Sequence, residues 1–117
     1  NSEERPKVPW IHLTSFEQLD EIETSSNVKP QVIFKHSTTC GISRMVLNMF
    51  TSSYGLEPNQ MNLYFLDLHA HRDVSNKVAE KFQVMHQSPQ LLIVKSGVVV
   101  AHDSHGAISD INLEQYI

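Results

Sequence analysis

Three consecutive apolar residues most constrain the fold of this 117-residue chain: Val32, Ile33 and Phe34. Side chains alternate between the two faces of a strand, so an unbroken apolar run indicates a strand that is covered on both faces. Such a strand lies in the centre of an α/β sheet, with helices packed on each side. The run therefore predicts a strand over 31–36 and requires neighbouring strands and helices that cover it.

Strand-like and helix-like patterns alternate along the rest of the chain. The connection Ser96-Gly97 predicts a tight hairpin between the last two strands, whereas the earlier alternation predicts parallel strands joined by right-handed crossovers. The expected strands are 8–13, 31–36, 61–68, 90–95 and 98–102, and the expected helices are 15–25, 41–54, a segment that begins at Arg72 or Asp73, and 108–117.

The fold class that follows is α/β, with a mixed β-sheet in the order β-α-β-α-β-α-β-β-α and helices on both faces. This order resembles the thioredoxin-like fold, and the resemblance covers residues 8–117. A chain of this length can bury a sufficient core without a disulfide, so we expect 8–117 to form a single thioredoxin-like domain. Residues 1–7 are polar and charged and are expected to form a flexible N-terminal arm.

The first expected helix carries a specific start signal. Thr14 or Ser15 offers an N-cap, and Glu17 stands three residues after Thr14, which is the spacing of a capping box. In a capping box, the two side chains each bind the other residue's backbone N–H. The sequence thus predicts that Glu17 reaches back to Thr14 at the start of helix 15–25.

Composition and charge argue against two classes of partner. The formal net charge is −4, whereas a nucleic-acid-binding protein needs a basic face. No apolar run approaches the ~20 residues that cross a bilayer, so no membrane association is expected. A single cysteine cannot form an internal disulfide, which favours a reducing compartment.

That single cysteine, Cys40, stands between the expected strand 31–36 and the expected helix 41–54. Ligands of open α/β sheets gather beyond the carboxyl ends of the strands, and the unpaired N–H groups at a helix start favour an anion. A free cysteine has a pKa of about 8.5, which a helix N-terminus lowers to roughly 3.5–7.5. The position predicts that Cys40 is a catalytic redox thiol; a small inert apolar residue is the alternative.

Polar residues surround this thiol in the sequence. Ser43 takes the place, three residues after Cys40, where a dithiol enzyme carries its second cysteine, so its hydroxyl is expected to hydrogen-bond the sulfur. A mixed disulfide on Cys40 must then be resolved by an external thiol. Lys35 and Arg44 either attract an anionic thiol substrate or are solvated surface charges. His36 either adds positive charge or simply ends the strand.

The seven histidines do not predict a metal site. His69-x-His71 and His102-x-x-His105 have ligand-like spacing, but each pair falls in an expected loop. Neither pair is accompanied by a cysteine or by a compact set of four ligands. Solvated loop histidines are expected, with no metal and no bound cofactor.

Three sequence segments, taken together with their order along the chain, point to a known family. They are Phe34-Lys35-His36-Ser37-Thr38-Thr39-Cys40-Gly41-Ile42-Ser43, then Ser88-Pro89-Gln90, then His102-x-Ser104-His105-Gly106-x-Ile108. Together they resemble the monothiol bacilliredoxin family of the YtxJ type. The resemblance implies a cytoplasmic thiol–disulfide oxidoreductase that removes bacillithiol, or a similar low-molecular-weight thiol, from mixed disulfides of S-thiolated client proteins. Bacillithiol is then a co-substrate rather than a cofactor.

The resemblance also implies where the substrate binds. Thioredoxin-like proteins hold a cis-proline that faces the thiol, which implies a cis Ser88–Pro89 bond here, although only ~5–6% of X–Pro bonds in folded proteins are cis. The backbone of Ser88 would then pair with an extended substrate, as an added strand does. The implied substrate-binding residues beside the catalytic Cys40 are Thr39, Gly41, Ser43, Ser88 and Pro89.

One residue departs from the family pattern. The family more often has Thr-Cys-Pro-Ile-Ser, whereas this chain has Gly41, so that Cys-Gly-Ile-Ser is similar to the Cys-Gly-Phe-Ser of monothiol glutaredoxins. Those proteins hold a shared [2Fe–2S] cluster with glutathione, but the paired glycines with which they bind glutathione are missing after 98–102. The oxidoreductase is favoured, and an iron–sulfur carrier and a non-catalytic thioredoxin-fold interaction module remain the alternatives.

Overall fold

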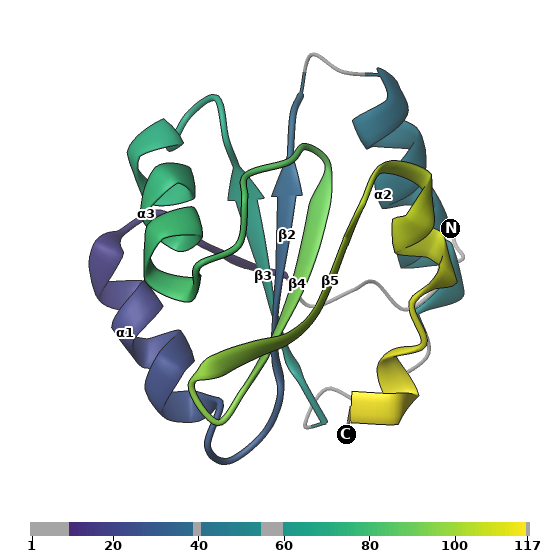
Figure 1. The fold of residues 1–117 in the computed structure, drawn as a ribbon. Coiled ribbons are helices and arrows are strands. Elements are labelled where there is room, and N and C mark those ends of the chain that lie inside the picture. Colours follow the sequence, from purple (N-terminus) through teal and green to yellow (C-terminus); the bar gives the residue numbers. More distant parts are fainter. Residues whose placement is uncertain (1–9, 39–40, 55–59, 117) are drawn as a thin grey trace, which may run out of the picture.

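The computed structural model describes residues 10–38, 41–54 and 60–116. In this part of the chain, five strands form one sheet in the order β1-β3-β2-β4-β5 (Figure 1). β3 is parallel to both β1 and β2, whereas β4 is antiparallel to both β2 and β5. The strands are β1 (Trp10–His12), β2 (Gln31–His36), β3 (Asn62–Asp67), β4 (Gln90–Lys95) and β5 (Val98–Ser104).

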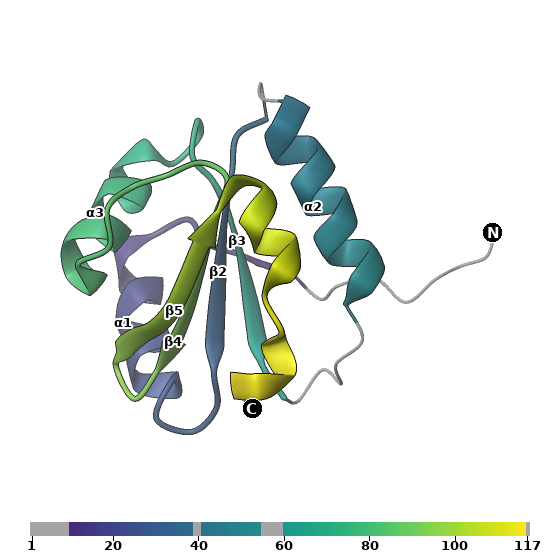
Figure 2. The ribbon, with the colours of Figure 1, turned by 45° about the vertical axis from the view of Figure 1, so that its right-hand side comes forward.

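Helices cover both faces of this sheet. Figures 1 and 2 show α1 and α3 on one side, and α2 with the C-terminal segment on the other. The α-helices are α1 (Phe16–Ser25), α2 (Gly41–Ser53) and α3 (Arg72–Phe82). The predicted α/β fold class, a mixed thioredoxin-like sheet between two helical layers, is confirmed. None of the helices in the described residues is long and apolar enough to span a membrane.

β2 is the central strand, as its apolar run predicts. All six of its residues are buried, and it pairs with β3 on one side and with β4 on the other. Ile33 belongs to a core cluster beneath α1 and α3, whereas Phe34 belongs to a second cluster beneath α2. Packing on both faces therefore holds β2, including its carboxyl end, in a fixed place within the sheet.

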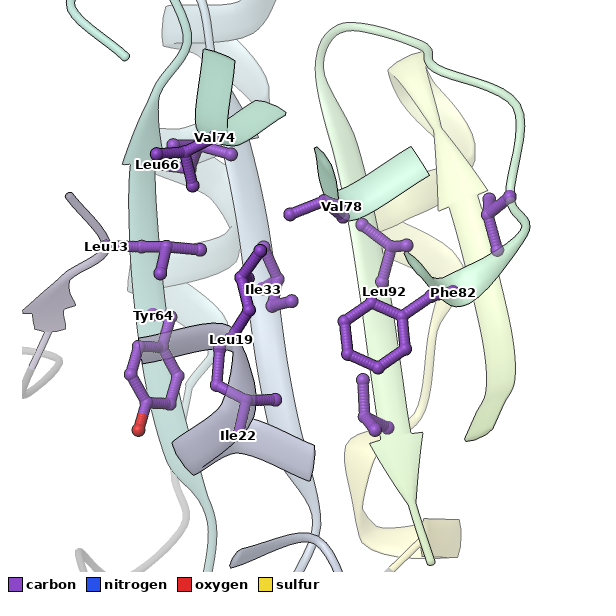
Figure 3. Close-up of a cluster of buried hydrophobic side chains, with 12 residues drawn as sticks. Leu13, Leu19, Ile22, Ile33, Tyr64, Leu66, Val74, Val78, Phe82 and Leu92 are labelled. Carbon is purple, nitrogen blue, oxygen red and sulfur yellow. The ribbon is translucent and has the colours of Figure 1, made fainter. Parts of the chain in front are cut away.

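The cluster beneath α1 and α3 is drawn in Figure 3. Val74, Val78 and Phe82 of α3 lie at helical spacing and present one apolar face to the sheet. Leu19 and Ile22 do the same for α1. The second cluster comprises Val32, Phe34, Val46, Phe50, Met61, Leu63, Leu91, Ile93, Ile108 and Leu113.

The start of α1 differs by one residue from the predicted capping box. Ser15 is the N-cap and Phe16 is the first helical residue. Gln18 reaches back, and its Oε1 accepts hydrogen bonds from the backbone N–H groups of Thr14 at 2.7 Å and Ser15 at 3.2 Å. The predicted capping box and the alternative of Ser15 as its N-cap are confirmed. Glu17 as the partner is wrong, because Ser15 rather than Thr14 sets the register, which makes Gln18 the third helical residue.

The predicted helix over 108–117 is also wrong. The chain forms two 3₁₀ helices instead, η1 (His105–Asp110) and η2 (Leu113–Tyr116). Between them, Oδ1 of Asn112 accepts a hydrogen bond from the backbone N–H of Glu114 at 3.1 Å. An asparagine side chain that binds the backbone two residues further on competes with a continuous helix, so the helical pattern breaks at this point.

β5 is longer than the predicted strand 98–102. Asp103 and Ser104, which lie beyond the end of the predicted strand, still pair with β4. The turn before β5 is the predicted two-residue hairpin connection, with positive φ at both Ser96 (54°) and Gly97 (82°).

Candidate active site

Cys40 and Thr39 lie outside the residues that the structure describes, so the site is built from the segments on either side. β2 ends at His36 and α2 begins at Gly41. The predicted change from a buried strand to a helix is therefore confirmed by the end of β2 and the start of α2. The interpretation of His36 as the end of the strand is also confirmed.

Ser43 ties the first turn of α2 to the end of β2. Its side chain is completely buried. Its Oγ accepts a hydrogen bond from the backbone N–H of Ser37 at 3.1 Å and lies 2.8 Å from Nδ1 of His36. The position that holds a second thiol in a dithiol enzyme thus holds a hydroxyl that is anchored to the strand. The hydrogen bond from Ser43 to the Cys40 sulfur stays a prediction.

His36 occupies a buried and partly aromatic environment. Its ring centroid lies 5.4 Å from that of Phe65, and its side chain is only 6% exposed. Burial is the main cause that lowers the pKa of His36, the nearby Arg44 and His69 lower it further, and the carboxylate of Asp67 acts in the opposite direction. The imidazole of His36 is therefore mostly neutral at pH 7.

A second hydrogen-bonded link joins the end of β2 to the turn after β3. Oγ of Ser37 lies 2.7 Å from Nε2 of His69. Oδ1 of Asp67 in turn accepts hydrogen bonds from the backbone N–H groups of His69 at 3.1 Å and Ala70 at 3.3 Å. The sequence analysis placed His69 in a loop and did not predict this contact. Within the described ranges, no group of three or more His, Cys, Asp or Glu side chains could hold a metal ion.

Ser88 and Pro89 lie at the same end of the sheet. Gln90 pairs with Lys35, so the segment before β4 comes alongside the end of β2. The Ser88–Pro89 peptide bond is cis. The carbonyl oxygen of Pro89 accepts a hydrogen bond from the backbone N–H of His105 at 3.0 Å. Oγ of Ser88 is buried and has no hydrogen-bond partner among the described residues.

Lys35 does not take either role that the sequence suggested. Its side chain is completely buried, and Nζ donates to the carbonyl oxygen of Ser75 at 3.3 Å and lies 3.2 Å from Nδ1 of His86. Ser75 belongs to α3, so the ammonium lies on the face of the sheet opposite α2. Lys35 is therefore neither a solvated charge nor an anion-binding residue beside Cys40. Arg44 is exposed and stays available for that role.

Burial lowers the pKa of Lys35 from its ordinary 10.5 to about 8. At neutral pH the ammonium of Lys35 is therefore less stable in the folded protein than in the unfolded chain, and it lowers the free energy of unfolding. Stability should rise as the pH increases from about 8 to about 10, because the folded protein then loses a proton that the unfolded chain keeps. The total difference is up to about 3 kcal/mol.

Replacing Lys35 by Met should remove this pH dependence. At pH 7 the free energy of unfolding of Lys35→Met is expected to exceed that of the wild-type protein by about 1–3 kcal/mol, because a buried charge is exchanged for an apolar side chain of similar volume. Urea unfolding of both proteins at pH 7, 8, 9 and 10 measures the difference. A Lys77→Met protein is the control, since Lys77 lies on the exposed face of α3. Equal pH profiles for all three proteins would contradict the prediction.

Gly41 begins α2 and is exposed, and a Cβ built on it would meet nothing within 4 Å. Proline is favoured at the first helical position and reduces the conformational freedom of the unfolded chain. Gly41→Pro should therefore raise the free energy of unfolding by about 0.4–1 kcal/mol, as measured in urea. Gly97→Ala is the matched control and should lower it, because Gly97 has φ +82°. A loss of stability in Gly41→Pro would contradict this.

The structure thus brings Gly41, Ser43, Ser88 and Pro89 to one end of the sheet. Sequence reasoning missed the links from Ser43 to His36 and from Ser37 to His69. Parallel pairing of β2 and β3 offered a signal for the second link, because the residues that follow parallel strands lie side by side. The link between Ser43 and His36 carried no such signal.

Several known proteins are similar to this chain. The family model described as "Monothiol bacilliredoxin BrxC" matches residues 11–113. A solved structure of a candidate oxidoreductase with a thioredoxin fold is 32% identical, with a TM-score of 0.75 and 92% of each chain covered. Thioredoxin from Malassezia sympodialis is 16% identical, with a TM-score of 0.75, covering 99% of this chain and 96% of that one. Thioredoxin from Trypanosoma brucei brucei is 20% identical, with a TM-score of 0.67 and coverage of 91% and 85%.

Proposed function

Because the chain belongs to the monothiol bacilliredoxin family, we propose that it is a thiol–disulfide oxidoreductase that removes bacillithiol from S-thiolated client proteins through Cys40. The 32%-identical relative with a thioredoxin fold supports a thiol redox role in general. Under this proposal the protein works in the cytoplasm, takes bacillithiol as a co-substrate and needs no bound cofactor.

The reaction has two exchange steps. The Cys40 thiolate attacks the bacillithiol sulfur of a modified client, which forms a Cys40–bacillithiol disulfide and releases the client cysteine as a thiolate that takes a proton from water. The thiolate of a second small thiol then attacks the bacillithiol sulfur, which forms a small-molecule disulfide and returns Cys40 as a thiolate. Each step breaks one S–S bond and forms one.

Ser43 is the observation that carries the monothiol assignment. A buried hydroxyl fills the position of a resolving thiol and is hydrogen-bonded to Ser37 and close to His36. A hydroxyl cannot attack the Cys40–bacillithiol disulfide, so an external thiol must complete the cycle. The junction of β2 and α2 supplies unpaired backbone N–H groups that favour a thiolate on Cys40.

The small thiol would bind beside this junction. Bacillithiol carries a malate group, and its carboxylates suit either the guanidinium of Arg44 or the N-terminus of α2. The extended segment of a client would pair with the backbone of Ser88 next to Pro89. Thr39 and Gly41 flank the sulfur in the sequence and complete the proposed substrate-binding residues.

The test uses a client protein that carries a bacillithiol mixed disulfide. Release of the client thiol is followed with the protein in catalytic amount and with free bacillithiol as the reductant. We expect turnover well above the rate with free bacillithiol alone. Turnover should be slower when glutathione replaces bacillithiol both in the mixed disulfide of the client and as the free reductant. A rate equal to that of bacillithiol alone would overturn the proposal.

Two further measurements separate the alternatives. A brown protein with a visible absorbance after anaerobic reconstitution with iron and sulfide would favour the iron–sulfur carrier. A Cys40 thiol that is alkylated slowly and titrates at about 8.5 or above would favour the non-catalytic interaction module. The oxidoreductase requires a colourless protein whose thiol titrates below that value.

A further inference from the structure

We propose that Lys35 and His86 are positioning residues for the client: their contact holds the segment that leads to Ser88 and Pro89, and protonation of His86 releases this segment. The inference rests on the proposed function for one step, the pairing of a client with the backbone of Ser88. The contact itself joins Nζ of Lys35 and Nδ1 of His86 at 3.2 Å.

The ammonium of Lys35 has few acceptors. Its side chain is completely buried, and burial is the cause of its lowered pKa. An ammonium carries three N–H donors. In the parts of the chain that the structure describes, its partners are the carbonyl oxygen of Ser75 at 3.3 Å and Nδ1 of His86, and no carboxylate forms an ion pair with it. His86 therefore supplies one of the two acceptors that compensate a buried charge.

Two contacts hold the chain on the amino side of Ser88. Nδ1 of His86 lies against Lys35 of β2, and the carbonyl oxygen of Met85 accepts a hydrogen bond from Nε2 of Gln90 at 3.0 Å. Lys35 and Gln90 are partners across β2 and β4, so the two anchors stand side by side. Met85 and His86 are themselves exposed. Polar contacts to the sheet, rather than burial of these two residues, therefore hold this part of the segment.

The ammonium of Lys35 does not serve stability. The Lys35→Met protein is expected to be more stable at pH 7, because an apolar side chain of similar volume avoids the desolvation of a charge. Departures from the usual rules of core composition are expected at functional sites. A residue with a purely structural role would stabilise the fold, so the burial of this charge points to a role in function.

The contact requires a neutral His86. A neutral imidazole accepts at Nδ1 when its proton is on Nε2, whereas an imidazolium donates from both nitrogens. The imidazolium of His86 would therefore face the ammonium of Lys35 with two donors and two like charges, which repel. Protonation of His86 thus removes the contact and frees the segment before Ser88.

The groups around His86 keep it neutral at pH 7. Burial is the main cause that lowers its pKa, and the positive charges of Lys35 and Arg72 lower it further. From α3, Oγ of Ser75 also lies 3.4 Å from Nδ1. From β4, the residue opposite Lys35 is the uncharged Gln90. The contact is therefore intact at neutral pH and is lost only in acid.

The first measurement follows the histidine directly. Nitrogen-15 NMR records the tautomer and titration of His86, together with the backbone amide signals of Gln87 and Ser88. We expect neutral His86 to carry its proton on Nε2, and the two amide signals to change with the same midpoint as the imidazole. In Lys35→Met, His86 should titrate at a higher pH, since a nearby positive charge is removed. Lys77→Met should leave this titration almost unchanged.

The second measurement compares two substrates at pH 7.5. One is a client-derived peptide with a bacillithiol mixed disulfide, and the other is the mixed disulfide of bacillithiol and cysteamine, which has no extended segment. For the peptide, Lys35→Met should raise KM about fivefold or more with kcat within about twofold, because the segment before Ser88 must then be ordered on binding. The kinetics with the small disulfide should stay within about twofold of wild type.

The third measurement tests the protonation of His86. His86→Asn places an amide oxygen where Nδ1 lies, since both are bonded to Cγ, and this oxygen accepts from Lys35 without titrating. Between pH 7.5 and pH 5, the peptide KM of the wild-type protein should rise about threefold or more relative to the KM of the small disulfide. In His86→Asn the same ratio should stay constant. His12→Asn, an exposed histidine on β1, is the matched control and should behave as wild type.

Several results would overturn the inference. One is a neutral His86 with its proton on Nδ1, and another is a peptide KM that does not change in Lys35→Met. An equal rise of the KM ratio in acid for His86→Asn and the wild-type protein is a third. Equal losses of Lys35→Met on both substrates, together with a lower free energy of unfolding, would show a structural role only.

The two proposals fail in different ways. If the wild-type protein releases bacillithiol from the peptide while KM is unaffected in Lys35→Met, only the positioning role is wrong. If the wild-type protein releases none from either substrate, the proposed function is wrong and the client role falls with it. The NMR titration then still decides whether the contact between Lys35 and His86 holds the segment before Ser88.

Discussion

The Cys40→Ala protein is expected to release bacillithiol from a modified client no faster than free bacillithiol does alone. Cys40 is the only cysteine in the chain, so no other thiolate can form the mixed disulfide. The hydroxyl of Ser43 cannot take its place, because it is buried and held by Ser37 and His36. The measurement is release of the client thiol at pH 7.5, with the mass of the wild-type intermediate recorded when the second small thiol is left out.

Ser43→Ala is the matched control for this prediction. At pH 7.5 a thiol with a lowered pKa is mostly ionised even after the loss of one hydrogen bond, so release should stay within about threefold of wild type. The wild-type protein should gain the mass of one bacillithiol, and Cys40→Ala should gain none. If Cys40→Ala released the client thiol as fast as the wild-type protein, the sulfur of Cys40 would not be catalytic.

Phe34→Ala is expected to lower the free energy of unfolding by about 3–5 kcal/mol, a large part of the 5–15 kcal/mol typical of a domain. Phe34 is completely buried in the centre of the sheet. Its ring lies 5.9 Å from that of Trp10 and 5.8 Å from that of Phe50, measured between centroids. Truncation therefore opens a cavity that joins β1, β2 and α2, and urea unfolding measures the loss.

The same substitution at Phe16 separates burial from the general effect of removing a ring. Phe16 is 50% exposed at the start of α1, so Phe16→Ala should change the free energy of unfolding by about 0.5 kcal/mol or less. Similar losses in the two variants would show that the cluster beneath α2 is not the main source of stability at Phe34.

The sheet could be predicted because its signals are local. The apolar run at Val32–Phe34 and the Ser96-Gly97 turn each identify a feature within a few residues, and the bounds of β2 and β4 agree with the expectation. The C-terminal helix could not be predicted from its apolar spacing, since the side chain of Asn112 competes for the backbone.

The candidate site was predictable only in part. The junction that contains Cys40 follows from the order of strand and helix. The burial of Lys35 does not, because its partners Ser75 and His86 lie 40 and 51 residues away in the sequence. The contact between His36 and Ser43 depends on how closely the first turn of α2 approaches β2, and no spacing rule encodes that distance.

The hydrogen bond from the His105 N–H to the Pro89 carbonyl has a consequence for synthesis of the chain. The residue that anchors the proline segment leaves the ribosome long after Cys40 does. A nascent chain therefore carries the segment around Pro89 before its anchor exists, so this end of the sheet is completed only after β5 has been synthesised.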